Sequence, residues 1–93
     1  KLAILPLVKK DGLPEIAREL MNECKSSFMC FYEEKDAIGK RYRRMDAIGT
    51  PFCVTVDHQT KEDNMVTIRY RDTMLQERVP IANLKEIVLK AIS

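Results

Sequence analysis

The strongest constraint on the fold is an alternation of short apolar runs with segments whose apolar residues recur at helical spacing. Residues 2–8 are nearly continuous in apolar side chains, as expected of a strand buried on both faces. After a polar turn at 9–12, apolar residues return at steps of three and four, and Pro14 suits the first turn of a helix. A buried strand followed by an amphipathic helix is typical of a sheet with parallel strands.

Similar patterns continue to the end of the chain. Strands are expected at 28–32, 52–56, 65–71 and 76–79, and helices at 36–48 and after Pro80. In the alternating segment 65–71, we expect Arg69 and Arg71 to face solvent. The resulting order, strand-helix-strand-helix-strand-strand-strand-helix, predicts a three-layer α/β domain with parallel early strands and an antiparallel later edge.

The two later helices each have a predicted inward stripe. In the final helix it comprises Ile81, Leu84, Val88 and Ala91. In the helix at 36–48 it comprises Ile38, Tyr42 and Met45, while Lys40, Arg43 and Arg44 share another face.

Length and composition limit the chain to one domain without a membrane segment. Its 93 residues are 45% hydrophobic and 32% charged, which is typical of a packed globular domain. No apolar run approaches the roughly 20 residues that cross a bilayer, so we expect a soluble, cytoplasmic domain. Because the chain starts inside an apolar run without a methionine, we expect residues 1–93 to be a fragment of a longer protein.

The residue types for catalysis or metal binding are not arranged for either. His58 is the one histidine, and no serine or cysteine motif flanks it. The three cysteines lie in apolar stretches without a C-x-x-C pair, as buried thiols do. Gly39-Lys40 lacks the upstream glycine of a phosphate-binding loop. We therefore expect no catalytic residue, no metal site and no cofactor in this chain.

Two local clusters indicate a nucleic-acid partner, although the net charge of only +2 does not. On the helix at 36–48, Lys40 and Arg44 could contact a phosphate backbone, or the basic face could simply be solvated. The segment 69–78 mixes arginines with a carboxylate and an amide, which suits the reading of base edges. A hairpin with surface ion pairs would have the same composition.

Four segments give the chain a family resemblance over nearly all of its length. It is similar to the anticodon-binding domain of the class IIa aminoacyl-tRNA synthetases for histidine, glycine, threonine and proline, and most of all to the glycyl enzymes of the homodimeric type. The segments are Pro6-Leu7-Val8-Lys9-Lys10-Asp11-Gly12, Ile38-Gly39-Lys40-Arg41-Tyr42-Arg43-Arg44, Asp46-Ala47-Ile48-Gly49-Thr50-Pro51-Phe52 and Thr67-Ile68-Arg69-Tyr70-Arg71-Asp72-Thr73-Met74.

The resemblance implies a fold, a partner and the separation of tRNA binding from catalysis. The fold would be a five-stranded mixed sheet with three flanking helices. The partner would be the anticodon stem-loop of tRNA(Gly), with no DNA and no membrane. Glycylation, with ATP and magnesium, would belong to a class II catalytic domain in the same chain of a parent enzyme that is a homodimer.

The resemblance also assigns candidate site residues. Arg71 and Asp72 match the family's arginine-aspartate pair, where contacts to anticodon bases are expected. His58 occupies a position where a planar side chain would stack on a base. The secondary candidates are Arg69, Gln76 and Arg78 for bases or phosphates, and Lys40 and Arg44 for the phosphate backbone.

Three alternatives remain open on the sequence. The chain could be a non-catalytic RNA-binding or accessory protein that uses the same fold. Its amino-acid specificity could be for threonine or proline. A small α/β thiol oxidoreductase is a third alternative, in which Cys30 would be the reactive thiol.

Overall fold

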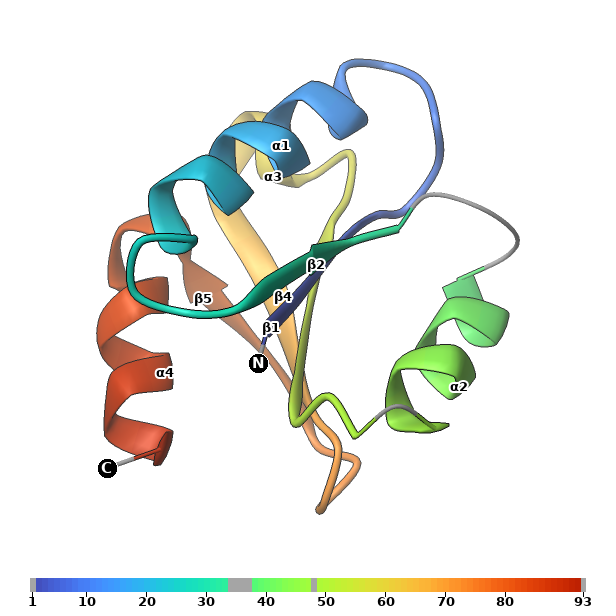
Figure 1. Ribbon diagram of the computed structural model, residues 1–93. Helices are drawn as coiled ribbons and strands as arrows, with labels where there is room; N and C mark the ends of the chain where they lie inside the picture. The colour runs from blue at the N-terminus through green and yellow to red at the C-terminus, as the bar shows by residue number, and fades with distance from the viewer. Residues whose placement is uncertain (1, 34–37, 48, 93) are drawn as a thin grey trace.

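Three layers make up the structure, with a central β-sheet between helices on both faces (Figure 1). The computed structural model describes residues 2–33, 38–47 and 49–92. In chain order the elements are β1 (Leu2–Pro6), α1 (Leu13–Cys24), β2 (Cys30–Tyr32), α2 (Ile38–Ala47), β3 (Phe52–Val56), α3 (Thr60–Asp63), β4 (Met65–Tyr70), β5 (Gln76–Pro80), the 3-10 helix η1 (Ile81–Asn83) and α4 (Leu84–Ile92).

The sheet is mixed, with the strand order β2-β1-β3-β4-β5. β1 pairs in parallel with β2 and β3, whereas β4 runs antiparallel to β3 and β5. Parallel neighbours require crossover connections, which contain α1 and α2, and the antiparallel strands need only short connections. The predicted fold class, with parallel early strands and an antiparallel later edge, is therefore confirmed.

The larger core lies between the sheet and the two helices α1 and α4. The apolar stripe of α1, which includes Leu13, Ala17 and Leu20, is fully or almost fully buried against the sheet. Leu84 and Val88 of α4 complete this core. The prediction that Ala91 belongs to the same stripe is wrong. It is exposed, and Leu84 and Val88 are the described residues that α4 contributes to this buried cluster.

A smaller core lies between α2 and the opposite face of the sheet. Met45 is buried against Ala3, Leu5 and Cys53, and Tyr42 packs half-buried against the same cluster. The predicted inward direction of this stripe is confirmed. Because the apolar contacts of α2 fall on β1 and β3, the helix leaves the β4–β5 side of this face largely free.

The boundaries differ from prediction at several elements: β1 ends at Pro6, β4 ends at Tyr70 and β5 extends to Pro80. The strand expected at 28–32 starts at Cys30, because the amide of Phe28 donates to the carbonyl of Cys24 and extends the helical turn. The polar turn after β3 contains the unpredicted helix α3, where Asp57 accepts from both the amide and the hydroxyl of Thr60. Of the helix expected at 36–48, positions 36, 37 and 48 lie outside the described residues.

The cysteines are free thiols with little tendency to ionise. Cys24 and Cys53 are buried, and burial raises the pKa of each to about 11. Burial also raises the pKa of the half-buried Cys30 thiol. Reactive cysteines need a lowered pKa, so this environment counts against a thiol oxidoreductase.

The helices in the described part of the chain are each too short or too polar to span a bilayer.

Candidate nucleic-acid interface

The β4–β5 side of the sheet presents polar side chains on the face that α2 leaves free. Residues paired across two strands point to the same face, so Thr67 and Arg78 lie together, as do Arg69 and Gln76. Gln76 is exposed, and Thr67 and Arg78 are half-buried. We call the surface formed by Thr67, Gln76 and Arg78 the open sheet face.

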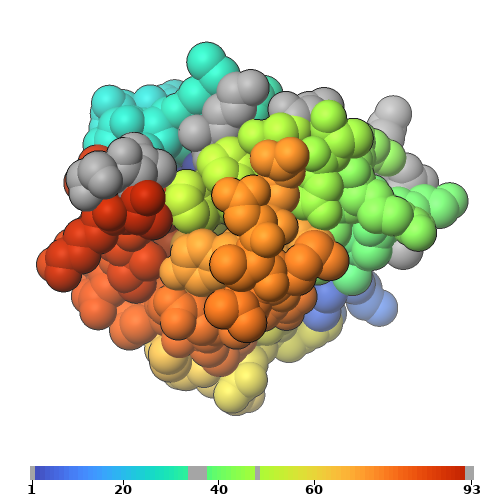
Figure 2. All heavy atoms as spheres, turned by 90° about the horizontal axis from the view of Figure 1, so that it is seen from below, coloured from blue at the N-terminus to red at the C-terminus, as the bar shows by residue number. Residues whose placement is uncertain are grey.

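The turn between β4 and β5 closes one end of the open sheet face. This turn, residues 71–75, is called the hairpin tip below. The amide of Met74 donates to the carbonyl of Tyr70 at 2.8 Å, which closes the turn. The amide of Arg71 donates to the carbonyl of Pro51 at 3.0 Å, which ties the tip to the start of β3. Figure 2 looks onto this end of the molecule, with the hairpin in orange beside the green α2.

The hairpin tip brings together the first-ranked site candidates. The side chains of Arg71 and Asp72 are 44% and 85% exposed, and their charged groups are 3.9 Å apart. So exposed an ion pair adds little stability, and both groups can exchange it for contacts with a ligand. The exposed Gln76 begins β5 directly after the tip. A guanidinium, a carboxylate and, at the start of β5, an amide are thus exposed at this end of the sheet, and each can bind the edge of an unpaired base.

The prediction that Arg69 faces solvent is wrong, because its side chain is buried. Its guanidinium is held by Asp46 of α2 through bonds of 3.0 and 3.1 Å, and it lies over the ring of Tyr42 at 4.8 Å. The last turn of α2 therefore covers this residue of the alternating strand. The hydrogen bond to Asp46 raises the pKa of Arg69 against the opposing effect of burial. Arg69 therefore links β4 to α2 beneath the candidate interface.

His58 and Arg78 lie towards the other end of the open sheet face. The Nε2 atom of His58 is 2.9 Å from a carboxylate oxygen of Asp11, and both side chains are about half exposed. The six residues of β4 separate the region of His58 from the hairpin tip by about 20 Å. A single base therefore cannot contact both His58 and Arg71.

The basic residues of α2 have different surroundings. Lys40 is exposed, as a residue that contacts a phosphate backbone must be. Arg44 forms an ion pair of 2.9 Å with Glu33 and is 39% exposed. Lys40 thus has the more accessible charge of the two predicted backbone contacts.

Arg78 holds two carboxylates at once. Its guanidinium donates to Asp57 at 3.0 and 3.2 Å and to Asp63 at 3.2 to 3.4 Å. Burial alone would raise the pKa of Asp57, but hydrogen bonds from Arg78 and Thr60 outweigh it and hold that pKa below its usual 3.8. The positive charge of Arg78, which is a predicted contact to bases or phosphates, is therefore balanced by these two carboxylates.

The lowered pKa of Asp57 predicts a pH-dependent stability. A carboxylate with a lower pKa in the folded state stabilises the fold above its unfolded pKa, and the contribution is lost as the pH falls through the folded pKa. We expect Asp57→Asn to be less stable than wild type at neutral pH, and the difference in stability to narrow as the pH falls below about 4. Urea unfolding across this range checks it, with the exposed Asp72→Asn as the control. A gap that stays constant on acidification would contradict the prediction.

Sequence analysis missed Met74 and Leu75 at the hairpin tip. Their side chains are 64% and 65% exposed, next to Arg71 and Asp72. The available signal was that an apolar pair interrupts the polar segment 69–78, which a solvated turn would not require. These two residues are considered again below.

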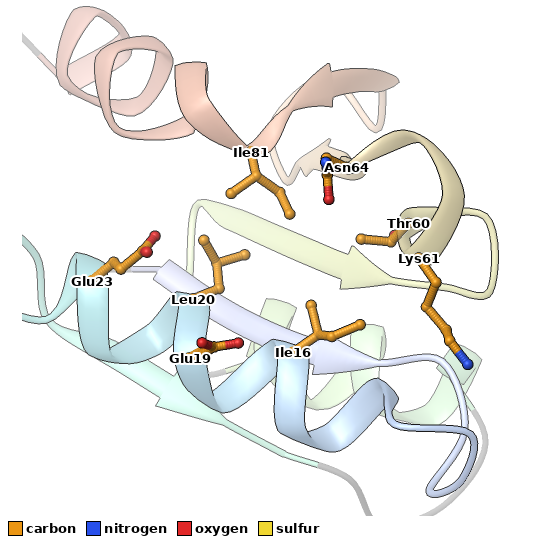
Figure 3. A pocket seen from close by; sticks show the side chains of 8 residues that line it. All are labelled: Ile16, Glu19, Leu20, Glu23, Thr60, Lys61, Asn64 and Ile81. Atoms are coloured by element: carbon orange, nitrogen blue, oxygen red, sulfur yellow. The ribbon is translucent and has the colours of Figure 1, made fainter.

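One hollow lies on the face of the sheet opposite the open sheet face. It has a volume of about 320 Å³ and lies between α1, α3 and η1 (Figure 3). Ile16 and Leu20 point towards Ile81 across it, and Glu19 and Glu23 lie along its rim. These carboxylates would repel RNA, so the hollow is not part of the interface. Within residues 2–33, 38–47 and 49–92, no three potential ligands are grouped to hold a metal ion.

The chain matches known proteins over nearly its whole length. A family model described as "Anticodon binding domain" covers residues 1–91. A glycine–tRNA ligase from Treponema denticola is 59% identical over 83 residues, which cover 89% of this chain and 18% of that protein. One from Chlorobaculum tepidum is 50% identical over 88 residues, which cover 95% of this chain and 19% of that protein. The chain thus spans about a fifth of the length of these curated relatives.

Solved structures share the fold. A prolyl-tRNA synthetase from Cryptosporidium parvum superposes with a TM-score of 0.87 at 20% identity, covering 97% of this chain and 20% of that one. The RNA binding domain of threonyl-tRNA synthetase from Cryptosporidium parvum Iowa II gives 0.80 at 23% identity, covering 91% of this chain and 22% of that one. With the family match, these findings confirm the resemblance seen in the sequence. The chain belongs to the family of anticodon binding domains, and within it the chain is similar to the domains of glycine–tRNA ligases.

Proposed function

We propose that this domain binds the anticodon stem-loop of tRNA(Gly) and checks its anticodon. The observation that carries the proposal is the exposure of Arg71 and Asp72 at the hairpin tip and of Gln76 directly after it. Glycine anticodons end in two cytosines. A carboxylate accepts from the cytosine amino group, and a guanidinium or an amide can donate to the carbonyl oxygen of the same base. The group at the tip therefore has the chemistry that these bases require.

The proposal extends to a parent enzyme. The names of the relatives at 50–59% identity support glycine as the amino acid. In this arrangement a class II catalytic domain in the same chain performs ATP-dependent glycylation with magnesium in the cytoplasm, and the enzyme is a homodimer. The role of this domain is to hold and check the tRNA.

A titration with two stem-loops tests the proposal. One stem-loop carries a glycine anticodon and the other has both cytosines replaced, at the same low salt concentration. We expect the wild type to prefer the glycine stem-loop by about 1–3 kcal/mol per base, because each mismatch leaves base-reading groups unpaired. Arg71→Ala should abolish this preference. Lys85→Ala removes the same charge from the exposed surface of α4 and should leave the preference intact.

Equal affinity of the wild type for both stem-loops would contradict the glycine assignment. The domain would then be better described by the alternative, a non-catalytic RNA-binding module of the same fold.

A further inference from the structure

The hairpin tip carries an apolar surface that base-edge recognition does not use. Met74 and Leu75 are 64% and 65% exposed and are adjacent in sequence. Arg71, Asp72 and Thr73 precede them, and all three are exposed. Polar groups that bind base edges and an apolar surface thus occur within one turn.

The shape of the tip is imposed by contacts and is not that of a free loop. Met74 has a φ of 61°, a left-handed conformation that side chains other than glycine and asparagine rarely adopt. Its sulfur accepts a hydrogen bond of 3.4 Å from the buried guanidinium of Arg69. The amide of Leu75 donates to the hydroxyl of Thr73 at 3.3 Å, and the carbonyl of Leu75 accepts from the amide of Tyr70 at 2.9 Å. Strain of this kind persists where the surroundings enforce it and is concentrated at functional positions.

The chemistry of this surface fits an unpaired base better than a protein partner. A base lifted out of its stack exposes an apolar ring face, which proteins cover with aromatic, guanidinium or apolar side chains. A stable protein interface buries about 800 Å² on each partner, far more than two side chains provide. The area of two apolar side chains instead suits a single base, and the groups proposed to bind base edges precede them in the same turn.

We infer that Met74 and Leu75 pack against the ring face of an unpaired base in the anticodon loop while Arg71 and Asp72 bind base edges. This inference rests on the proposed function and adds a second kind of contact to it. Met74 and Leu75 determine how tightly a base is held, and the polar pair determines which base is accepted. Arg69 acts as a positioning residue, because it holds the sulfur of Met74 from below.

The test compares Leu75→Ser with Leu89→Ser, which makes the same change on α4 at a residue that is 48% exposed. We expect Leu75→Ser to bind the glycine stem-loop about tenfold more weakly, within the range known for contacts to base faces. Leu89→Ser should bind like wild type. The loss should persist at higher salt because the contact is apolar, and both variants should keep the wild-type melting temperature. Repeating the titration with abasic nucleotides at each loop position should reveal one position where Leu75→Ser no longer matters.

The outcomes separate this inference from the proposed function. If Leu75→Ser binds like wild type while Arg71→Ala still abolishes the glycine preference, the inference is overturned and the proposed function stands. If Leu75→Ser lowers the affinity for both stem-loops equally and the wild type shows no preference between them, the contact to a base face stands and the glycine assignment is wrong. A wild-type domain that binds neither stem-loop overturns both.

Discussion

Arg41→Met is expected to lower the free energy of unfolding by about 3–5 kcal/mol, because it leaves several backbone carbonyl groups without their hydrogen-bond donor. Arg41 is 1% exposed. Its guanidinium donates to the carbonyls of Pro6 at 2.6 Å, Leu7 at 2.9 Å and Glu33 at 3.0 Å. Methionine fills a similar volume but leaves three carbonyl groups without these donors, and each orphaned buried group costs about 1–3 kcal/mol.

The loss would remove a large part of the total stability. Domains of this length are stable by about 5–15 kcal/mol, so a loss of this size brings the variant close to unfolding at physiological temperature. Burial lowers the pKa of Arg41, but the group stays charged at neutral pH because arginine starts from a very high value.

Urea unfolding followed by circular dichroism measures the effect, with Arg43→Met as the control. Arg43 is exposed on the same helix, so its replacement should change stability by less than about 0.5 kcal/mol. If Arg41→Met also stays within 1 kcal/mol of wild type, on the order of an average substitution, Arg41 does not hold the strand ends together.

The second large effect is expected at the pair of Arg69 and Asp46. Arg69→Met should cost about 2–4 kcal/mol, somewhat less than breaking a fully buried ion pair, because the side chain of Asp46 is 28% exposed. The variant leaves Asp46 without its two hydrogen bonds and removes the cation from the ring of Tyr42. The contact between the last turn of α2 and the hairpin would be weakened at the same time.

A double-mutant cycle isolates the pair. Arg69→Met, Asp46→Asn and the double variant are unfolded in urea, and we expect a coupling free energy of about 1–3 kcal/mol. Arg71→Met provides the matched control, since Arg71 is exposed on the same strand end and should cost little. A coupling below about 0.5 kcal/mol would mean that the two residues act independently.

The general architecture follows from local patterns. The apolar run at 2–8 contains β1, Leu2–Pro6, whose residues are all buried because β1 lies inside the sheet with helices on both faces. The helical spacing of Leu13, Ala17 and Leu20 alone determines which face of α1 packs on the sheet. Such periodicities indicate directly which side chains are buried. The crossover connections that parallel strands require then limit the possible order of strands in the sheet. The exposed pair Arg71 and Asp72 was located from family resemblance, and the structure places it at an accessible turn.

Three arginines have partners that lie far along the sequence, and local patterns do not reveal such partners. Arg41 lies inside a basic run, but the carbonyls that it binds belong to β1 and to the residues that follow β1 and β2. Arg69 occupies an alternating strand, but Asp46, 23 positions away, draws it beneath α2. The guanidinium of Arg78 likewise forms ion pairs with Asp57 and Asp63.

The sequence alone determined the layers and the strand and helix faces of this domain, because burial imposes a local period on the chain. Its family was recognised separately, from the resemblance carried by four sequence segments. Only the tertiary structure decided which arginines are held by partners within the protein and which stay exposed. A guanidinium on a flexible stem can bind a carbonyl, a carboxylate or a nucleic acid equally well, and its choice depends on acceptors that distant segments bring within about 3 Å.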